Sequence, residues 1–112
     1  MCRLCKENII ADRKISKSVK KLVHKIEQKY RPETILLYGS LARGDFHEGS
    51  DLDMIVVADF KEHFFDRIGG LLELNKTAMD FEPLAYTPLE FRRMIKEGRP
   101  LIRTALREGV VV

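Results

Sequence analysis

Two aspartates that open an apolar run, shortly after a glycine-serine pair, constrain this chain more than any other feature. Residues 38–57 read YGSLARGDFHEGSDLDMIVV, so ten residues separate Gly39-Ser40 from Asp51. Positions i and i+2 of a strand point to one face with Cα atoms roughly 6.5 Å apart, so Asp51 and Asp53 can both reach one cluster of divalent cations. Hard oxygen ligands favour Mg²⁺ or Mn²⁺. The arrangement suits metal-assisted transfer of a nucleotide.

The Gly39-Ser40 pair predicts the other half of such a site. A glycine lets the backbone approach a triphosphate closely, and free N–H groups at the start of the next segment can hold its oxygens together with the Ser40 hydroxyl. Arg43 follows three residues later, on the same side of a short helical turn, and its planar guanidinium suits bidentate contact with phosphate. A structural salt bridge from Arg43 to Asp45 or Glu48 is the alternative.

Taken together, these residues resemble the DNA polymerase beta-like nucleotidyltransferase superfamily, and specifically its minimal stand-alone branch, the MNT proteins. The matched pattern is Gly39-Ser40, ten residues, and Asp51-x-Asp53. The flanking features also match, namely the apolar run Ile35-Leu36-Leu37-Tyr38, then Ala42-Arg43-Gly44, and Ser50 before the first aspartate. The resemblance implies an α/β fold, a small mixed β-sheet with helices packed against it. It also implies that the extra helical domains of larger relatives are missing.

The resemblance further implies a third carboxylate on the strand after the second long helix, and two residues compete for it. Asp80 lies between apolar neighbours and has the shorter side chain, which gives a more defined metal geometry, so we favour it at this point. Glu82 lies at the expected distance from the helix start at Thr87-Pro88 and could carry the role or assist. Both share one strand face, being i and i+2. Pro83 indicates that this strand is at or near an edge, or bulged.

The resemblance also implies a function. Minimal MNT proteins resemble antitoxins that pair with HEPN ribonuclease toxins and silence them by transferring AMP from ATP to a tyrosine. In that case Asp51 and Asp53 hold Mg²⁺ or Mn²⁺, and Asp80 or Glu82 holds a second ion and accepts the proton of the attacking hydroxyl. Gly39 and Ser40 then bind the β and γ phosphates, with Arg43 as a clamp.

Two other functions stay open. The first is nucleotidyl transfer to a nucleic acid or a small molecule, guided by a basic N-terminal helix whose lysines are Lys14, Lys17, Lys20, Lys21, Lys25 and Lys29. The second is a non-catalytic binding subunit that masks a toxin by contact alone. A homo-oligomer also stays open, because nothing in the sequence decides the oligomeric state.

Charge is divided unevenly along the chain. Its 112 residues leave room for one domain, 1–112, with one modest core. Residues 1–31 hold ten Lys and Arg against three acids, and residues 32–112 hold ten against fourteen, so the two parts carry about +7 and −4. The basic part could meet RNA or an acidic partner, but a solvated helix face explains it better, so we expect no nucleic-acid partner.

We expect a cytoplasmic protein without membrane contact. No apolar run reaches about 18 residues, and the first ten residues, MCRLCKENII, lack the apolar segment of a signal peptide. Cys2 and Cys5 form a single C-x-x-C with no second ligand pair, so we interpret them as free thiols rather than zinc ligands. His47 is interpreted as a loop residue.

The spacing of apolar residues, together with residues that begin or end helices, predicts the helices and strands. Apolar positions at helical spacing predict a helix over 12–30, and Pro32 ends it. Gly69 and Gly70 interrupt a second helix over 61–74, where we expect a frayed surface turn rather than a kink or a close backbone contact. Thr87 to Glu90 forms a capping box. The other expected segments are strands 34–38, 52–58 and 79–86, a helical turn 40–44, a loop 45–49, a helix 88–97 ended by Gly98, a last helix from Pro100, and an edge strand 110–112.

Overall fold

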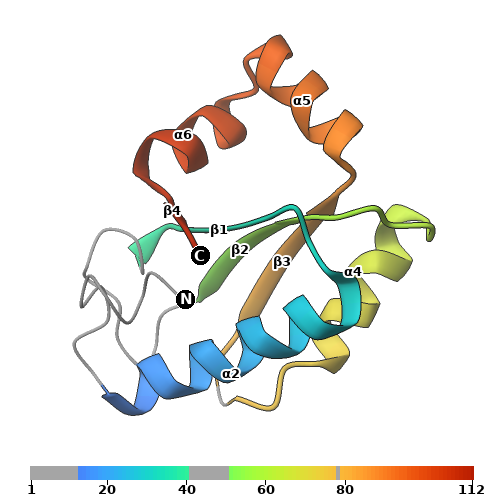
Figure 1. Ribbon diagram of the computed structural model, residues 1–112. Helices are drawn as coiled ribbons and strands as arrows, with labels where there is room; N and C mark the ends of the chain where they lie inside the picture. The colour runs from blue at the N-terminus through green and yellow to red at the C-terminus, as the bar shows by residue number, and fades with distance from the viewer. Residues whose placement is uncertain (1–12, 41–50, 78) are drawn as a thin grey trace.

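The computed structural model describes residues 13–40, 51–77 and 79–112. The described elements are α2 (Arg13–Tyr30), β1 (Thr34–Tyr38), β2 (Leu52–Val57), α4 (Phe64–Glu73), β3 (Phe81–Tyr86), α5 (Pro88–Glu97), α6 (Pro100–Glu108) and β4 (Val110–Val111). The strands form one sheet in the order β3-β2-β1-β4 (Figure 1). The predicted α/β fold with a small mixed sheet is therefore confirmed.

Strand direction changes within the sheet. β2 runs antiparallel to β1 and parallel to β3, and β4 runs antiparallel to β1. β3 lies at an edge of the sheet. The proline in its middle indicated this position, because Pro83 cannot donate a hydrogen bond to a further strand. β1 and β2 lie inside the sheet, which explains why their sequences are almost entirely apolar.

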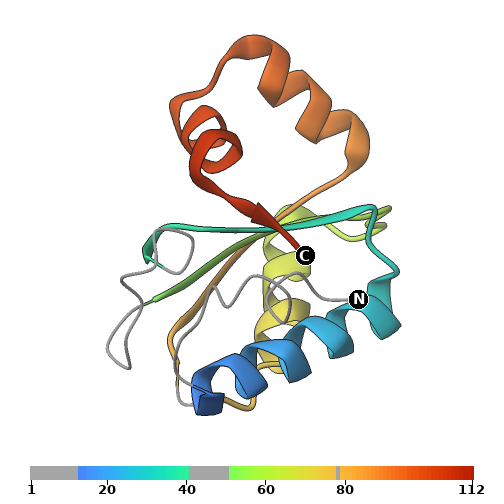
Figure 2. The same cartoon turned by 60° about the vertical axis from the view of Figure 1, so that its left-hand side comes forward.

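Helices cover both faces of the sheet (Figures 1 and 2). α2 and α4 pack on the face that carries Leu52, Met54 and Val56, which we call the α2 face. α6 packs on the face that carries Leu36, Ile55 and Val57, which we call the α6 face. Alternation along each strand separates the two sets, because successive side chains point to opposite faces. The α2 face carries the larger core.

The capping box predicted at the start of α5 is present. The Thr87 hydroxyl accepts from the Glu90 N–H at 3.2 Å, and the Thr87 N–H donates to Glu90 Oε1 at 2.8 Å. This backbone hydrogen bond is the largest cause that lowers the pKa of Glu90, and Arg67 lowers it further. Arg67 is a buried residue of α4 whose Nη1 lies 2.7 Å from Glu90 Oε1. The helix start is thereby fixed to α4, and Gly98 ends the helix at φ 68° as expected.

The second helix differs from the prediction. α4 runs without interruption from Phe64 to Glu73, so the expected frayed turn at Gly69 and Gly70 is wrong. A Cβ on Gly70 would meet the hydroxyl of Tyr30 at 2.5 Å, whereas one on Gly69 would meet nothing within 4 Å. Gly70 therefore makes room for a side chain of α2, a long-range contact that local propensity does not contain.

The third strand also begins later than predicted, at Phe81 instead of Met79. Asn75 Nδ2 donates to the Met79 carbonyl at 3.1 Å, and the Met79 N–H donates to the Thr77 hydroxyl at 3.2 Å. Local hydrogen bonds in the α4–β3 connection thus engage the backbone of Met79. In the part of the chain that the structure describes, no helix has the length and apolar character needed to span a bilayer.

Candidate functional site

Three polar side chains lie in one row across the sheet. Asp53 of β2 pairs with Tyr38 of β1 on one side and with Glu82 of β3 on the other. Paired residues of neighbouring strands point to the same face, and the strands are about 4.8 Å apart. Asp53 shares its face with Ile55, the α6 face, and is half-buried, whereas Glu82 is exposed. The row is therefore open to solvent at one end.

Gly39 lies directly against the Asp53 carboxylate. A Cβ built on Gly39 would collide with Oδ2 of Asp53, and the φ of Gly39 is 75°, a left-handed conformation that side chains rarely adopt. Both observations require glycine here. The sequence predicts that this glycine lets a triphosphate approach the backbone, and in the structure the glycine also makes room for the aspartate. Ser40 follows as a half-buried helical residue.

Tyr38 is a residue of this site that the sequence did not single out. The pKa of its hydroxyl is raised from 10.0 to about 12, mainly by burial and then by the nearby Asp53, Tyr86 and Glu82, in that order. The hydroxyl therefore stays protonated and can donate a hydrogen bond beside the two carboxylates. Its position directly before Gly39 was visible in the sequence, but its pairing with Asp53 depends on the strand register.

Asp51 and Asp80 lie one step further out. Each directly precedes a strand and is exposed. The Leu52 N–H donates to the Asp80 carbonyl at 2.7 Å, which places the starts of β2 and β3 side by side. Asp80 is thus level with Asp51, whereas Glu82 is level with Asp53. All four carboxylates gather at the same end of two parallel strands.

The donor set agrees in chemistry with a hard divalent cation. Asp53 and Glu82 offer carboxylate oxygens on one face, and oxygen donors are what Mg²⁺ prefers. Among the described residues, no group of three or more His, Cys, Asp or Glu side chains is arranged to hold a metal ion. Arg43 and His47 belong to the segment 41–50 and, like Cys2 and Cys5, lie outside the described residues, so the predictions made for them remain predictions.

Comparison with known proteins identifies the class. The family model described as "Polymerase beta, Nucleotidyltransferase" matches residues 20–112. The chain therefore belongs to the polymerase beta nucleotidyltransferase family, and the resemblance seen in the motif is confirmed. It is an enzyme domain of the nucleotidyl-transfer class.

Two individual proteins are similar to the chain. A protein of Methanocaldococcus jannaschii named a "putative protein adenylyltransferase" is 44% identical over 45 residues, which cover 38% of this chain and 45% of that protein. The match thus spans less than half the length of that relative. A crystal structure described as a "putative nucleotidyltransferase" from Sulfolobus solfataricus has a TM-score of 0.56 at 23% identity and covers 85% of this chain and 76% of the other. At that identity, the likeness shows the fold.

Proposed function

We propose that this domain transfers AMP from ATP to a hydroxyl group of a partner protein, with Mg²⁺ or Mn²⁺ as cofactor. The observation that carries the proposal is the register of Asp53 with Tyr38 and Glu82, directly against Gly39 at the Gly-Ser pair. Acids that hold cations and a backbone that approaches phosphates are needed side by side in such a reaction. The family assignment supports nucleotidyl transfer independently.

The proposed reaction is a displacement at the α-phosphorus of ATP. The acceptor hydroxyl oxygen forms a bond to that phosphorus, the bond to the bridging oxygen of the β-phosphate breaks, and pyrophosphate leaves. The backbone at Gly39 and the Ser40 hydroxyl bind the β and γ phosphates, with Arg43 as the clamp. A carboxylate accepts the proton of the acceptor hydroxyl. Asp51, Asp53 and a third carboxylate are the residues that would hold a divalent cation, which supplies neutralisation of phosphate charge when bound.

We assign the third carboxylate to Glu82 rather than Asp80. The strand register supports this assignment, because Glu82 pairs with Asp53 whereas Asp80 precedes β3. Electrostatics supports it as well, since Glu82 is among the groups that raise the pKa of Tyr38 and Asp80 is not. The shorter side chain of Asp80 favours that residue in the sequence, but side-chain length does not include the alignment of β3 with β2.

The acceptor is proposed to be a protein, and specifically a HEPN-type toxin whose tyrosine receives AMP. The name of the Methanocaldococcus jannaschii relative, a protein adenylyltransferase, supports a protein acceptor. The toxin itself follows from the resemblance to minimal MNT antitoxins. Transfer to a nucleic acid or small molecule is the alternative, and the exposed lysines of α2, among them Lys17, Lys21 and Lys25, are the observation that favours it.

Thermal shift tests the nucleotide site. ATP with Mg²⁺ should raise the melting temperature, and ATP in EDTA should do so far less, because the acids repel an uncompensated triphosphate. Asp51→Asn with Asp53→Asn should fold and lose this metal-dependent shift. Asp59→Asn with Asp66→Asn removes the same charge from exposed positions away from the row and should keep the shift. An unchanged shift in the Asp51/Asp53 variant would place the nucleotide elsewhere.

Label transfer tests the acceptor. ATP labelled at the α-phosphate should modify a purified HEPN-type protein on tyrosine and release pyrophosphate. Contact between the two proteins without ATP consumption would instead establish the non-catalytic binding subunit. Label on RNA or on a small molecule in place of protein would establish the alternative acceptor.

A further inference from the structure

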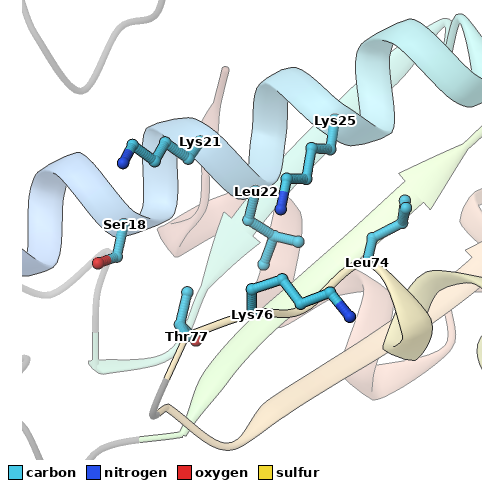
Figure 3. Close-up of a pocket in the computed structure, with 7 residues that line it drawn as sticks. All are labelled: Ser18, Lys21, Leu22, Lys25, Leu74, Lys76 and Thr77. Atoms are coloured by element: carbon cyan, nitrogen blue, oxygen red, sulfur yellow. The ribbon is translucent and has the colours of Figure 1, made fainter.

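A lysine-lined pocket lies on the α2 face, apart from the row of acids. Its volume is about 260 Å³, and it lies between α2 and the connection from α4 to β3. Lys21 and Lys25 come from the helix, and Lys76 comes from the connection (Figure 3). The other lining residues are Ser18, Leu22, Leu74 and Thr77. Neither the family assignment nor the proposed transfer uses this pocket.

The three ammonium groups have no protein partner among the described residues. The salt bridges of the described residues join other groups, and among those residues no side-chain hydrogen bond involves Lys21, Lys25 or Lys76. All three lysines are exposed, and no acid lines the pocket. Figure 3 shows Lys25 reaching down from α2 beside Leu22, with Lys76 opposite it on the connection. The ammonium group of Lys21 points away from the other two in Figure 3, so Lys25 and Lys76 are the pair on either side of the hollow, and a bound anion would reduce the repulsion between their charges.

The connection that carries Lys76 is held in place by its neighbours. Asn75 Oδ1 accepts from the Thr77 N–H at 3.1 Å and from the Thr77 hydroxyl at 2.5 Å. Asn75 Nδ2 donates to the Met79 carbonyl at 3.1 Å. These bonds fix the backbone on both sides of Lys76, so its approach to α2 is built into the fold. The Thr77 hydroxyl is already engaged, which leaves the three ammonium groups and the Ser18 hydroxyl as donors.

We propose that this pocket binds the phosphate group of a small phosphate anion, either inorganic pyrophosphate or a phosphate monoester. Lysine ammonium groups bind phosphate as point charges, and several of them together match its several oxygens. The pocket volume of about 260 Å³ is below the range of about 300 to 1,000 Å³ usual for whole drug-sized ligands, so it suits a phosphate group rather than a complete nucleotide. Leu22 and Leu74 offer an apolar wall for part of an ester.

The sheet separates this pocket from the candidate nucleotide site. Leu22 belongs to the core of the α2 face, whereas Asp53 and Glu82 point to the α6 face. A ligand in the pocket therefore does not contact the row of acids. The proposal is independent of the proposed transfer, and it can be tested without metal, acceptor or catalysis.

The test is a titration of the whole chain in EDTA. Calorimetry measures the affinity, and the amide signals of an NMR spectrum show which residues respond. Pyrophosphate and ribose 5-phosphate are the two probes, and they distinguish the inorganic from the ester source. The signals of Ser18, Lys76 and Thr77 should shift, while those of Gly39 and Ser40 should not. Replacing all three pocket lysines by glutamine should weaken binding roughly tenfold or more, because the positive charge that lines the pocket is removed.

The matched control removes three positive charges from α5, on the other side of the sheet. Arg92→Gln, Arg93→Gln and Lys96→Gln lie at exposed positions and should leave the affinity unchanged within about twofold, once melting temperatures show that both variants are folded. An equal loss of affinity in both variants would mean that net charge alone explains the binding, and it would overturn the proposal. Shifts centred on Gly39, or no binding at millimolar probe, would overturn it too. So would tighter binding of a single-stranded RNA with shifts along the whole of α2.

Discussion

The two faces of the sheet are built from the same strands but end differently. On the α2 face, apolar side chains continue to the first residue of β2, because Leu52 is fully buried there. On the α6 face, the apolar residues Ile55 and Val57 give way to Asp53, which lies beside Glu82. The neighbouring residues Leu52 and Asp53 of β2 thus belong to the buried core and to the row of acids, respectively.

This difference shows how a small domain can keep a charged site beside a core. A strand with alternating faces places Leu52 and Met54 in the larger core while it presents Asp53 to the other side. The α2 face can be packed with apolar side chains up to the start of β2, and the α6 face can be left open where the acids begin. Stability and chemistry should therefore respond to different substitutions in the same strand.

The largest expected effect concerns nucleotide transfer on the α6 face. Glu82→Gln removes a charge level with Asp53, so we expect transfer of labelled AMP to fall roughly a thousandfold, or by about 4 kcal/mol of barrier. ATP binding should persist, because Asp51, Asp53 and the Gly-Ser pair remain. The measurement compares label transfer with the metal-dependent thermal shift in the same protein.

Asp80→Asn is the matched control, since it removes the same charge two positions earlier. We expect it to lower transfer less than about tenfold, or about 1.4 kcal/mol. The opposite ranking would return the third carboxylate to Asp80, and it would show that side-chain length outweighs register. Two mild effects would mean that the domain works without a third carboxylate.

A stability effect is expected next, on the α2 face. Met54 is fully buried in the larger core, so Met54→Ala should lower the free energy of unfolding by about 2 to 5 kcal/mol, because it leaves a cavity. Asp53→Asn, one position earlier, should change it far less, since that side chain is only half-buried. Urea denaturation of both variants measures the difference. A larger loss for Asp53→Asn would contradict the division of the strand into a structural and a chemical face.

Much of this arrangement could be predicted from the sequence, for identifiable reasons. The Thr87 cap and the Gly98 stop are local signals, and both are where the sequence placed them. β1 is also where the apolar run predicted it, because a buried strand reads as a continuous apolar segment. The sequence also named Asp51, Asp53, Asp80 and Glu82 as candidate site residues, and it favoured Asp80 as the third carboxylate.

The remaining features depend on contacts between distant segments. The collision that an alanine at Gly39 would make with Asp53 follows from the pairing of β1 with β2, not from the glycine itself. The choice of Glu82 over Asp80 likewise rests on the register of β3 against β2. Tyr38 joins the acids for the same reason. Local patterns fix which residue types are present, whereas register fixes which of them meet.

A smaller effect is expected in alkaline solution, and it tests the environment of Tyr38. Burial and the nearby carboxylates raise the pKa of Tyr38 from 10.0 to about 12, so the folded state holds this proton more tightly than the unfolded state. The resulting stability is fully present below about pH 10 and is lost as the pH rises through about 12. Tyr38→Phe should therefore lose less stability than the parent protein across this interval.

Denaturation midpoints at neutral and alkaline pH measure the Tyr38 effect. All other titratable groups are the same in both proteins, so the difference between the two profiles isolates the tyrosine. Some decline should remain in Tyr38→Phe, because burial also raises the pKa of Tyr86. If the midpoints of both proteins changed with pH in parallel, the close approach of Tyr38 to Asp53 and Glu82 would be contradicted. The α6 face would then lack the pH dependence that distinguishes it here from the α2 face.

The smallest effect is expected on the side of helix α2 that faces solvent and carries its lysines. The opposite side of this helix, with Val19, Leu22 and Ile26, belongs to the core, so solvation of the outer face explains the lysines without a nucleic-acid ligand. We expect only weak binding of single-stranded RNA at about 0.15 M salt, and an affinity that falls by roughly 0.7 log units per log unit of salt for each phosphate contact. Fluorescence anisotropy over a salt series measures both quantities, with Lys17→Gln as the variant outside the phosphate pocket. Submicromolar affinity that Lys17→Gln weakens would make the outer side of α2 a nucleic-acid surface, and the acceptor of the transfer reaction would then be sought among RNAs rather than proteins.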